Sequence, residues 1–99
     1  LKLNTPLLKE FSFSVIKGDF IKKLALIGDK FDIIFLDPPY QKYSLNLMLE
    51  AIYNSDIMSD EGVLIIEESK KIIIPAEHPL KLIDKRIYGD TSLLFFKKN

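Results

Sequence analysis

The chain has 99 residues, of which 47% are hydrophobic and 28% are charged, a composition typical of one small globular domain. Its formal net charge is zero, which argues against nucleic-acid binding unless basic residues gather locally. Adjacent basic residues such as Lys70-Lys71 do occur, but such pairs are more typical of solvated faces. The absence of cysteine excludes disulfides, thiolate metal sites and cysteine nucleophiles.

The first part of the chain predicts two strands with a short helix between them. Residues 11–16 alternate apolar and polar side chains, as a half-buried strand does. Asp19 can then cap a helix that ends at Gly28. Residues 31–36 form a nearly continuous apolar run, which is too short for a helix once Pro38 stops it. This run predicts a strand that is buried on both faces.

The middle of the chain predicts a second helix and a third strand. Ser44 can cap this helix, and its apolar residues share one face. These residues are Leu45, Met48, Leu49 and Ile52. Gly62 is expected to open a strand over residues 63–67. Glu67 and Glu68 then lie at its carboxyl end, where they either orient a substrate or simply face solvent.

The last part of the chain predicts an antiparallel hairpin. Strands over residues 81–86 and 92–97 flank Gly89-Asp90, a favoured turn pair. Strands that alternate with helices and then close with a hairpin predict one α/β domain over residues 1–99, with a three-layer, Rossmann-like sheet. The strand phenylalanines are expected in its core. They are Phe11, Phe13, Phe31, Phe35, Phe95 and Phe96.

No segment resembles a membrane span or a signal peptide, so we expect a cytoplasmic protein. No apolar run approaches the ~20 residues that cross a bilayer. The only histidine, His78, lies between Glu77 and Pro79 in a turn-like stretch. It is expected at the surface rather than as a catalytic base or metal ligand.

The most informative motif is Asp37-Pro38-Pro39-Tyr40, which follows the apolar strand. It places a carboxylate at the carboxyl end of a central strand, where ligands bind in open α/β sheets. The two prolines remove backbone donors, so the carbonyls of Asp37 and Pro38 are expected to be free to accept from a ligand. The same residues are also an ordinary way for a strand to end in a loop.

The chemistry of a base amine explains why these residue types would occur together. The lone pair of an exocyclic amine is delocalised into the ring, which makes the nitrogen a poor nucleophile. A carboxylate and a carbonyl that accept its two N–H groups would free the lone pair for attack on a methyl sulfonium. Tyr40 would then stack on a base that has been splayed from its helix.

The motif Asp37-Pro38-Pro39-Tyr40 matches that of amino-group methyltransferases that use S-adenosylmethionine. The surrounding chain resembles the RsmD family, which methylates a guanine amine in small-subunit ribosomal RNA. Three further segments carry this resemblance. Residues 17–20 resemble the family's cofactor-adenine segment, residues 62–69 the strand after the catalytic loop, and residues 88–92 the terminal hairpin.

The resemblance implies a cofactor, a partner and site residues. Asp37, Pro38, Pro39 and Tyr40 would be catalytic, S-adenosylmethionine would be the cofactor, and ribosomal RNA or the small subunit the partner, with no metal required. The family residue that matches Asp19 accepts from the adenine amine, and the next backbone N–H, here that of Phe20, donates to the ring. Asp19 serves equally well as a helix cap, and the two roles are compatible.

The chain departs from the family in its glycines. The family's glycine-rich loop, which cradles the methionine part of the cofactor, has no counterpart, and neither does the acidic residue that holds the ribose. Glycine occurs only singly, at positions 18, 28, 62 and 89. We therefore expect the carboxyl-terminal half of a methyltransferase, inactive and unable to bind cofactor by itself. The alternatives are a non-catalytic interaction domain and a fragment of a DNA adenine methyltransferase.

The missing strands also affect topology. In the family's sheet, two strands that this chain lacks separate the strand of residues 11–16 from the strand that ends at Asp37. An unpaired apolar strand is a template for another edge. We expect these two strands to pair directly, with a homodimer through the exposed sheet edge covering the remaining apolar surface.

Overall fold

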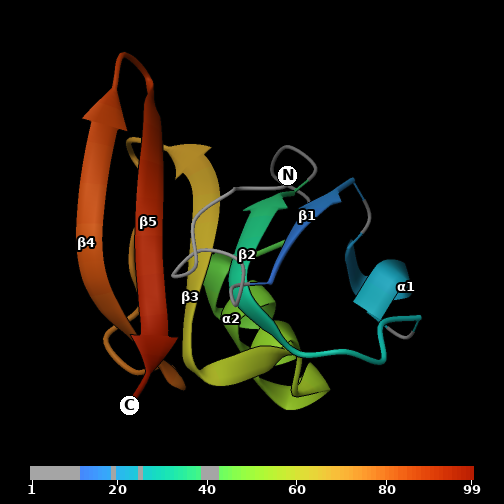
Figure 1. The fold of residues 1–99 in the computed structure, drawn as a ribbon. Helices are drawn as coiled ribbons and strands as arrows, with labels where there is room; N and C mark the ends of the chain where they lie inside the picture. Colours follow the sequence, from blue (N-terminus) through green and yellow to red (C-terminus); the bar gives the residue numbers. More distant parts are fainter. Residues whose placement is uncertain (1–11, 19, 25, 39–42) are drawn as a thin grey trace, which may run out of the picture.

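A computed structural model describes residues 12–18, 20–24, 26–38 and 43–99. Five strands form one sheet with the order β1-β2-β3-β5-β4 (Figure 1). They are β1 (Phe13–Lys17), β2 (Phe31–Asp37), β3 (Met58–Ser69), β4 (Leu80–Tyr88) and β5 (Thr91–Lys98). The first three are parallel, whereas β5 is antiparallel to both β3 and β4. The predicted α/β class and the closing hairpin are confirmed.

The strand β1 lies directly beside β2, as expected. The two are paired in parallel from Phe13 opposite Ile33 to Lys17 opposite Asp37. The other side of β2 pairs with β3, so both edges of this central apolar strand are satisfied. Phe11 lies outside the described residues.

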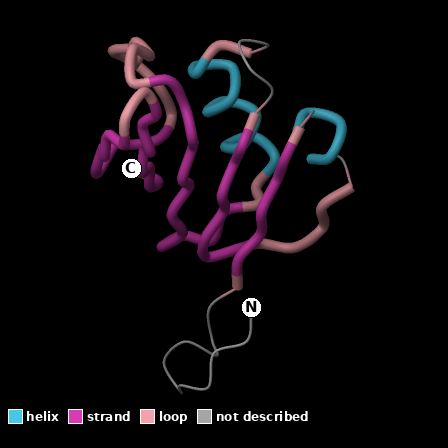
Figure 2. The backbone as a smooth tube through the Cα atoms, turned by 90° about the horizontal axis from the view of Figure 1, so that it is seen from above, coloured by secondary structure: helices cyan, strands magenta, loops and turns pink. Residues whose placement is uncertain are grey.

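Two helices lie on the same face of the sheet, as Figure 2 shows. They are α1 (Phe20–Leu24) and α2 (Leu45–Ser55), and neither described helix is long and apolar enough to cross a membrane. Ser44 caps α2 as predicted, because its hydroxyl accepts from the Leu47 N–H at 3.1 Å. The predicted end of α1 at Gly28 is wrong. The helix stops at Leu24, and the Ile27 N–H donates to the Leu24 carbonyl in a tighter turn at 3.2 Å.

The core lies between α2 and the face of the sheet that it covers. Side chains from β2, β3 and β5 are fully buried there, and so are the four predicted positions of α2. The buried strand residues include Ile34, Leu36, Leu64, Ile66 and Phe96. Leu24 and Ile27 pack against the same cluster, which places the α1 segment on this face as well.

The opposite face of the sheet is partly open. Phe13, Val15 and Ile33 are exposed by 42%, 51% and 37%. The prediction that β2 is buried on both faces is therefore wrong, and so is the assignment of Phe13 to the core. Of the three expected layers, the described residues form two. An apolar run indicates burial, but it does not say which element covers each face.

The strand β3 begins five residues earlier than the predicted start at residue 63. It starts at Met58, opposite Phe31 of β2, and Gly62 lies within it. A Cβ at Gly62 would meet the backbone oxygens of Phe31 and Ser59 at 3.0 Å. Glycine is thus required by a close approach of backbone, not by the start of a strand.

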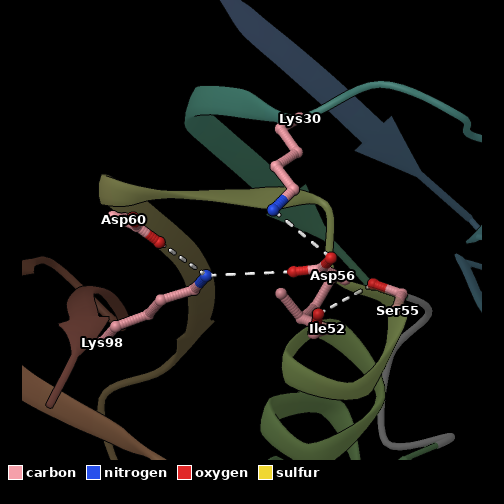
Figure 3. A network of polar contacts seen from close by, with 6 residues as sticks. All are labelled: Lys30, Ile52, Ser55, Asp56, Asp60 and Lys98. Atoms are coloured by element: carbon pink, nitrogen blue, oxygen red, sulfur yellow. Dashed lines mark hydrogen bonds and ion pairs between the residues drawn. The ribbon is translucent and has the colours of Figure 1, made fainter.

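Ion pairs tie elements together at the amino ends of the parallel strands (Figure 3). Asp56 ends α2 in the left-handed conformation with φ of 57°. Its carboxylate lies 3.3 Å from Lys30, which precedes β2, and 4.0 Å from Lys98, the last residue of β5. Lys98 also lies 3.6 Å from Asp60. Exposed pairs of this kind contribute about 0–1 kcal/mol each, so the network mainly fixes geometry.

Asp32 joins three segments at the same end of the sheet, where the parallel strands begin. Its carboxylate accepts from the Ser12 N–H at 2.9 Å and from the Ser59 hydroxyl at 2.8 Å. These hydrogen bonds, that from Ser12 first, hold the pKa of Asp32 below its usual value. This carboxylate is therefore structural. The opposite end of the sheet, where β2 ends at Asp37, is available for a site.

Candidate functional site

A cavity of about 390 Å³ opens at the carboxyl ends of β2 and β3. Three separate parts of the chain line it: the end of β2, the end of β3 and the turn between β4 and β5. The lining residues are Asp37, Pro38, Glu67, Glu68, Ser69, Asp90 and Thr91. The structure thus brings Asp37 and Pro38 together with Glu67 and Glu68 at the carboxyl end of β3. Pro39 and Tyr40 lie outside the described residues.

The main chain of Asp37 is held in place by β1. The Gly18 N–H donates to the Asp37 carbonyl at 3.2 Å, and Gly18 has a φ of 73°, which favours glycine. The expectation that this carbonyl is free is therefore wrong, because β1 pairs directly with β2 and the residue that follows β1 donates to it. Within the described part of the chain, no donor contacts the Asp37 carboxylate or the Pro38 carbonyl.

The β4–β5 turn and the start of β5 are hydrogen-bonded to the end of β3. Ser92 is fully buried, and its hydroxyl lies 3.3 Å and 3.2 Å from the carbonyl oxygens of Glu68 and Ser69. The Lys70 N–H donates to the Asp90 carbonyl at 3.0 Å. Sequence reasoning missed Asp90 and Thr91 as lining residues. The signal for them is the pairing of the last strand with β3, which depends on the sheet order.

The cavity is strongly acidic. Four carboxylates line it, from Asp37, Glu67, Glu68 and Asp90, and Lys70 lies 3.4 Å from the Asp90 carboxylate. Burial raises the pKa of Glu68, against the smaller opposing effect of the Ser69 backbone N–H. Such a lining attracts cations and N–H donors and repels phosphates. Among the described residues, no cluster of three or more acidic or histidine side chains is arranged to hold a metal ion.

The described residues do not fit S-adenosylmethionine. The strands β1 and β2 lie side by side as far as Lys17 opposite Asp37, so no loop of backbone amides lies between them within the sheet. The Gly18 N–H is already occupied by the Asp37 carbonyl. Asp19 lies outside the described residues, and only the backbone of Phe20, at the start of α1, is described. The predicted adenine contacts therefore stay predictions.

His78 lies away from the cavity and is half-buried rather than at the surface. Its ring packs edge-on against Phe96, with 5.8 Å between ring centroids and 88° between planes. The predicted surface position is wrong, because Phe96 is fully buried and His78 covers one side of it. This contact gives His78 a packing role.

The chain is similar to several known proteins, some of which carry methyltransferase names. It is 30% identical over 66 residues to a Bacillus subtilis (strain 168) protein provisionally named rRNA methyltransferase YlbH, a match that covers 66% of this chain and 36% of that protein. A solved structure of a conserved hypothetical protein from Streptococcus pyogenes has 25% identity and a TM-score of 0.70, and the match covers 79% of this chain and 49% of that one.

A second solved structure shares the fold. An Escherichia coli protein, provisionally named methyltransferase YhhF, has 20% identity and a TM-score of 0.61, and the match covers 80% of this chain and 44% of that one. The chain thus spans about a third to a half of the length of these relatives. Residues 1–97 match the model of the family described as conserved hypothetical protein 95. Because this match covers nearly the whole chain, the chain belongs to that RsmD-like methyltransferase family.

Proposed function

We propose that this chain is the amine-binding part of an S-adenosylmethionine-dependent methyltransferase that acts on a guanine amine in small-subunit ribosomal RNA. A segment other than the described residues would hold the cofactor. The observation that carries the proposal is the position of Asp37 and Pro38 in an acidic cavity at the carboxyl ends of β2 and β3. The names of the relatives support the RNA substrate, and such a substrate is consistent with a cytoplasmic protein.

The described residues are suited to gripping an amine. The Asp37 carboxylate and the Pro38 carbonyl are acceptors, and the backbone of Asp37 is fixed by its hydrogen bond from Gly18. When both accept N–H groups from one amine, the lone pair localises on the nitrogen and becomes more nucleophilic. The neighbouring carboxylates add a negative potential that favours N–H donors over the phosphates of the same RNA. Tyr40 would stack on the base, and Pro39 would fix the turn between them.

Guanosine and inosine provide a direct test, because inosine differs only in lacking the exocyclic amine. We expect guanosine, titrated into isotope-labelled chain, to shift the backbone amide signals of Asp37, Glu67 and Thr91 in nuclear magnetic resonance spectra. Inosine should bind roughly tenfold to a hundredfold more weakly, as expected for loss of hydrogen bonds to a charged group. Asp37→Asn keeps the side-chain shape but replaces one acceptor oxygen by a donor, so it should remove the preference.

The same titration separates the alternatives. Equal responses to guanosine and inosine would contradict an amine site at Asp37. A clear preference for adenosine, whose amine is at a different ring position, would instead favour a fragment of a DNA adenine methyltransferase. No response to any nucleoside would favour a non-catalytic interaction domain.

We also propose that two copies of the chain associate through the open side of the sheet. Phe13, Val15 and Ile33 form an exposed apolar surface on β1 and β2. Exposed apolar surfaces of this kind tend to associate.

A further inference from the structure

Charge is distributed unevenly along this neutral chain. Residues 70–99 contain seven Lys and Arg against three Asp and Glu, a net charge of +4, whereas residues 1–69 contain seven against eleven, a net charge of −4. The positive part includes the β4–β5 hairpin, whose turn lines the acidic cavity. A substrate that carries both an amine and phosphates would therefore meet an acidic cavity beside a basic hairpin.

Tyr88 is an exposed aromatic residue at the edge of this cavity. It is the last residue of β4 and is 59% exposed. It pairs across the hairpin with Thr91, which lines the cavity. Residues directly opposite each other on antiparallel strands project to the same face with Cβ atoms about 4.5–5.5 Å apart. Tyr88 therefore projects to the same face of the sheet as Thr91, a residue that lines the cavity.

Arg86 lies on the same face as Tyr88, because the two residues are separated by one position in a strand. Its side chain is 61% exposed, and its Nε atom lies 3.0 Å from Asp84 Oδ2. The hydrogen bond to Asp84, and to a lesser extent the Tyr88 side chain, hold the pKa of Arg86 above its usual value, so the guanidinium stays charged. The terminal N–H groups of a guanidinium held through Nε can still bind a phosphate.

We propose that Tyr88 and Arg86 bind the nucleotide next to the target base, with the base stacked on Tyr88 and its phosphate bound by Arg86. This inference rests on the proposed function, since it assumes an RNA substrate. The acidic cavity repels phosphates, so the backbone of a bound strand must run outside it, and the basic hairpin is the adjoining surface of opposite charge. A base next to a splayed-out target loses a stacking neighbour, and an exposed ring replaces it.

A short, fluorescein-labelled oligouridine is the suitable probe, because uridine has no exocyclic amine and reports on this surface rather than on the amine site. Fluorescence anisotropy should show that Tyr88→Ala weakens binding by roughly 5-fold to 150-fold, the range for loss of base stacking. Arg86→Ala should also weaken binding and should reduce the slope of log affinity against log salt by about 0.7, as for one phosphate contact on a single strand. Tyr88→Ala should leave that slope unchanged.

Two matched controls lie away from this hairpin, near the amino ends of the parallel strands. Tyr53 on α2 is 46% exposed, and Lys30 pairs with Asp56. Tyr53→Ala and Lys30→Ala should bind oligouridine like the unmodified chain. Equal losses in the controls and the test variants would overturn the proposal, and so would the absence of binding by the unmodified chain at low salt.

Tyr88→Trp gives a second readout that does not depend on a weakened variant. The chain has no tryptophan, so the new indole is the only one present. Its fluorescence should be quenched when oligouridine stacks on it. Binding without quenching would overturn the stacking role of position 88. Normal oligouridine binding together with equal guanosine and inosine responses would instead contradict only the proposed amine site.

Discussion

Glu68 is the cavity carboxylate whose burial has a measurable consequence for stability. Burial raises its pKa above the usual value of 4.5. A group with a raised folded-state pKa contributes stability that is fully present below the unfolded value and is lost as pH rises through the folded value. The charged side chain therefore lowers the stability of the chain at neutral pH, where binding would take place.

Glu68→Gln should remove this pH dependence. We expect the variant to be more stable than the unmodified chain at about pH 7 and similar to it at about pH 4, in urea unfolding followed by circular dichroism. Glu67→Gln, which removes a neighbouring exposed charge on the same strand, is the matched control. A Glu68→Gln chain that is less stable than the unmodified chain at neutral pH would show that burial does not dominate at this site.

Single residues were predictable from sequence where a local rule fixes them. Asp37 could be placed at the end of a strand because Pro38 stops the apolar run that precedes it. The bond from Gly18 to the Asp37 carbonyl could not be foreseen, because it depends on which strand lies beside β2. Thr91 was missed as a cavity residue for the same reason, since only the order of the strands brings it to β3.

At the scale of elements, β3 requires a residue without a side chain at Gly62. A methyl group there would meet two backbone oxygens at 3.0 Å, and backbone cannot move aside as a flexible side chain can. We expect Gly62→Ala to lower the free energy of unfolding by about 1–3 kcal/mol, as overpacking of a filled site does. Thermal or urea unfolding measures the difference.

Gly28 is the matched control for this substitution. A Cβ at Gly28 has no heavy atom within 4 Å, and its φ is not in the left-handed region. Gly28→Ala should therefore be neutral or should stabilise the chain by about 0.4–1 kcal/mol, because alanine restricts the unfolded state. Similar effects at both positions would contradict the close approach at Gly62.

The bounds of the elements were predictable only where the local pattern agrees with the pairing. The helix α2 has a cap at Ser44 and an apolar face, and both are local features. By contrast, residues 58–61 are mostly polar and do not have the sequence of a strand, yet Met58 pairs with Phe31 and begins β3. Tertiary pairing overrides weak local preference there. The single turn of α1 ends early for a related reason, since a helix of five residues has little stability of its own.

At the scale of the whole molecule, the sequence predicted the direct pairing of β1 with β2, but not the open face of the sheet. Composition and periodicity give the number of apolar residues, and they do not distinguish one covered face from two. The strands β1 and β2, which carry the apolar surface, together span about 10 Å across and about 23 Å along seven residues, so this surface offers roughly 230 Å². That is below the ~800 Å² per partner that stable complexes bury.

A homodimer through this face should therefore be weak and dependent on concentration. We expect light scattering coupled to size exclusion to show a mass that rises from monomer towards dimer between low and high micromolar chain. Val15→Lys places a charge at the centre of the β1 surface, where Val15 is 51% exposed, and should keep the chain monomeric. Leu47→Lys is the matched control, since Leu47 is 44% exposed on α2, on the covered side of the sheet. A mass that stays monomeric at every concentration, or a loss of dimer in both variants alike, would mean that the apolar surface of β1 and β2 is not where two copies meet.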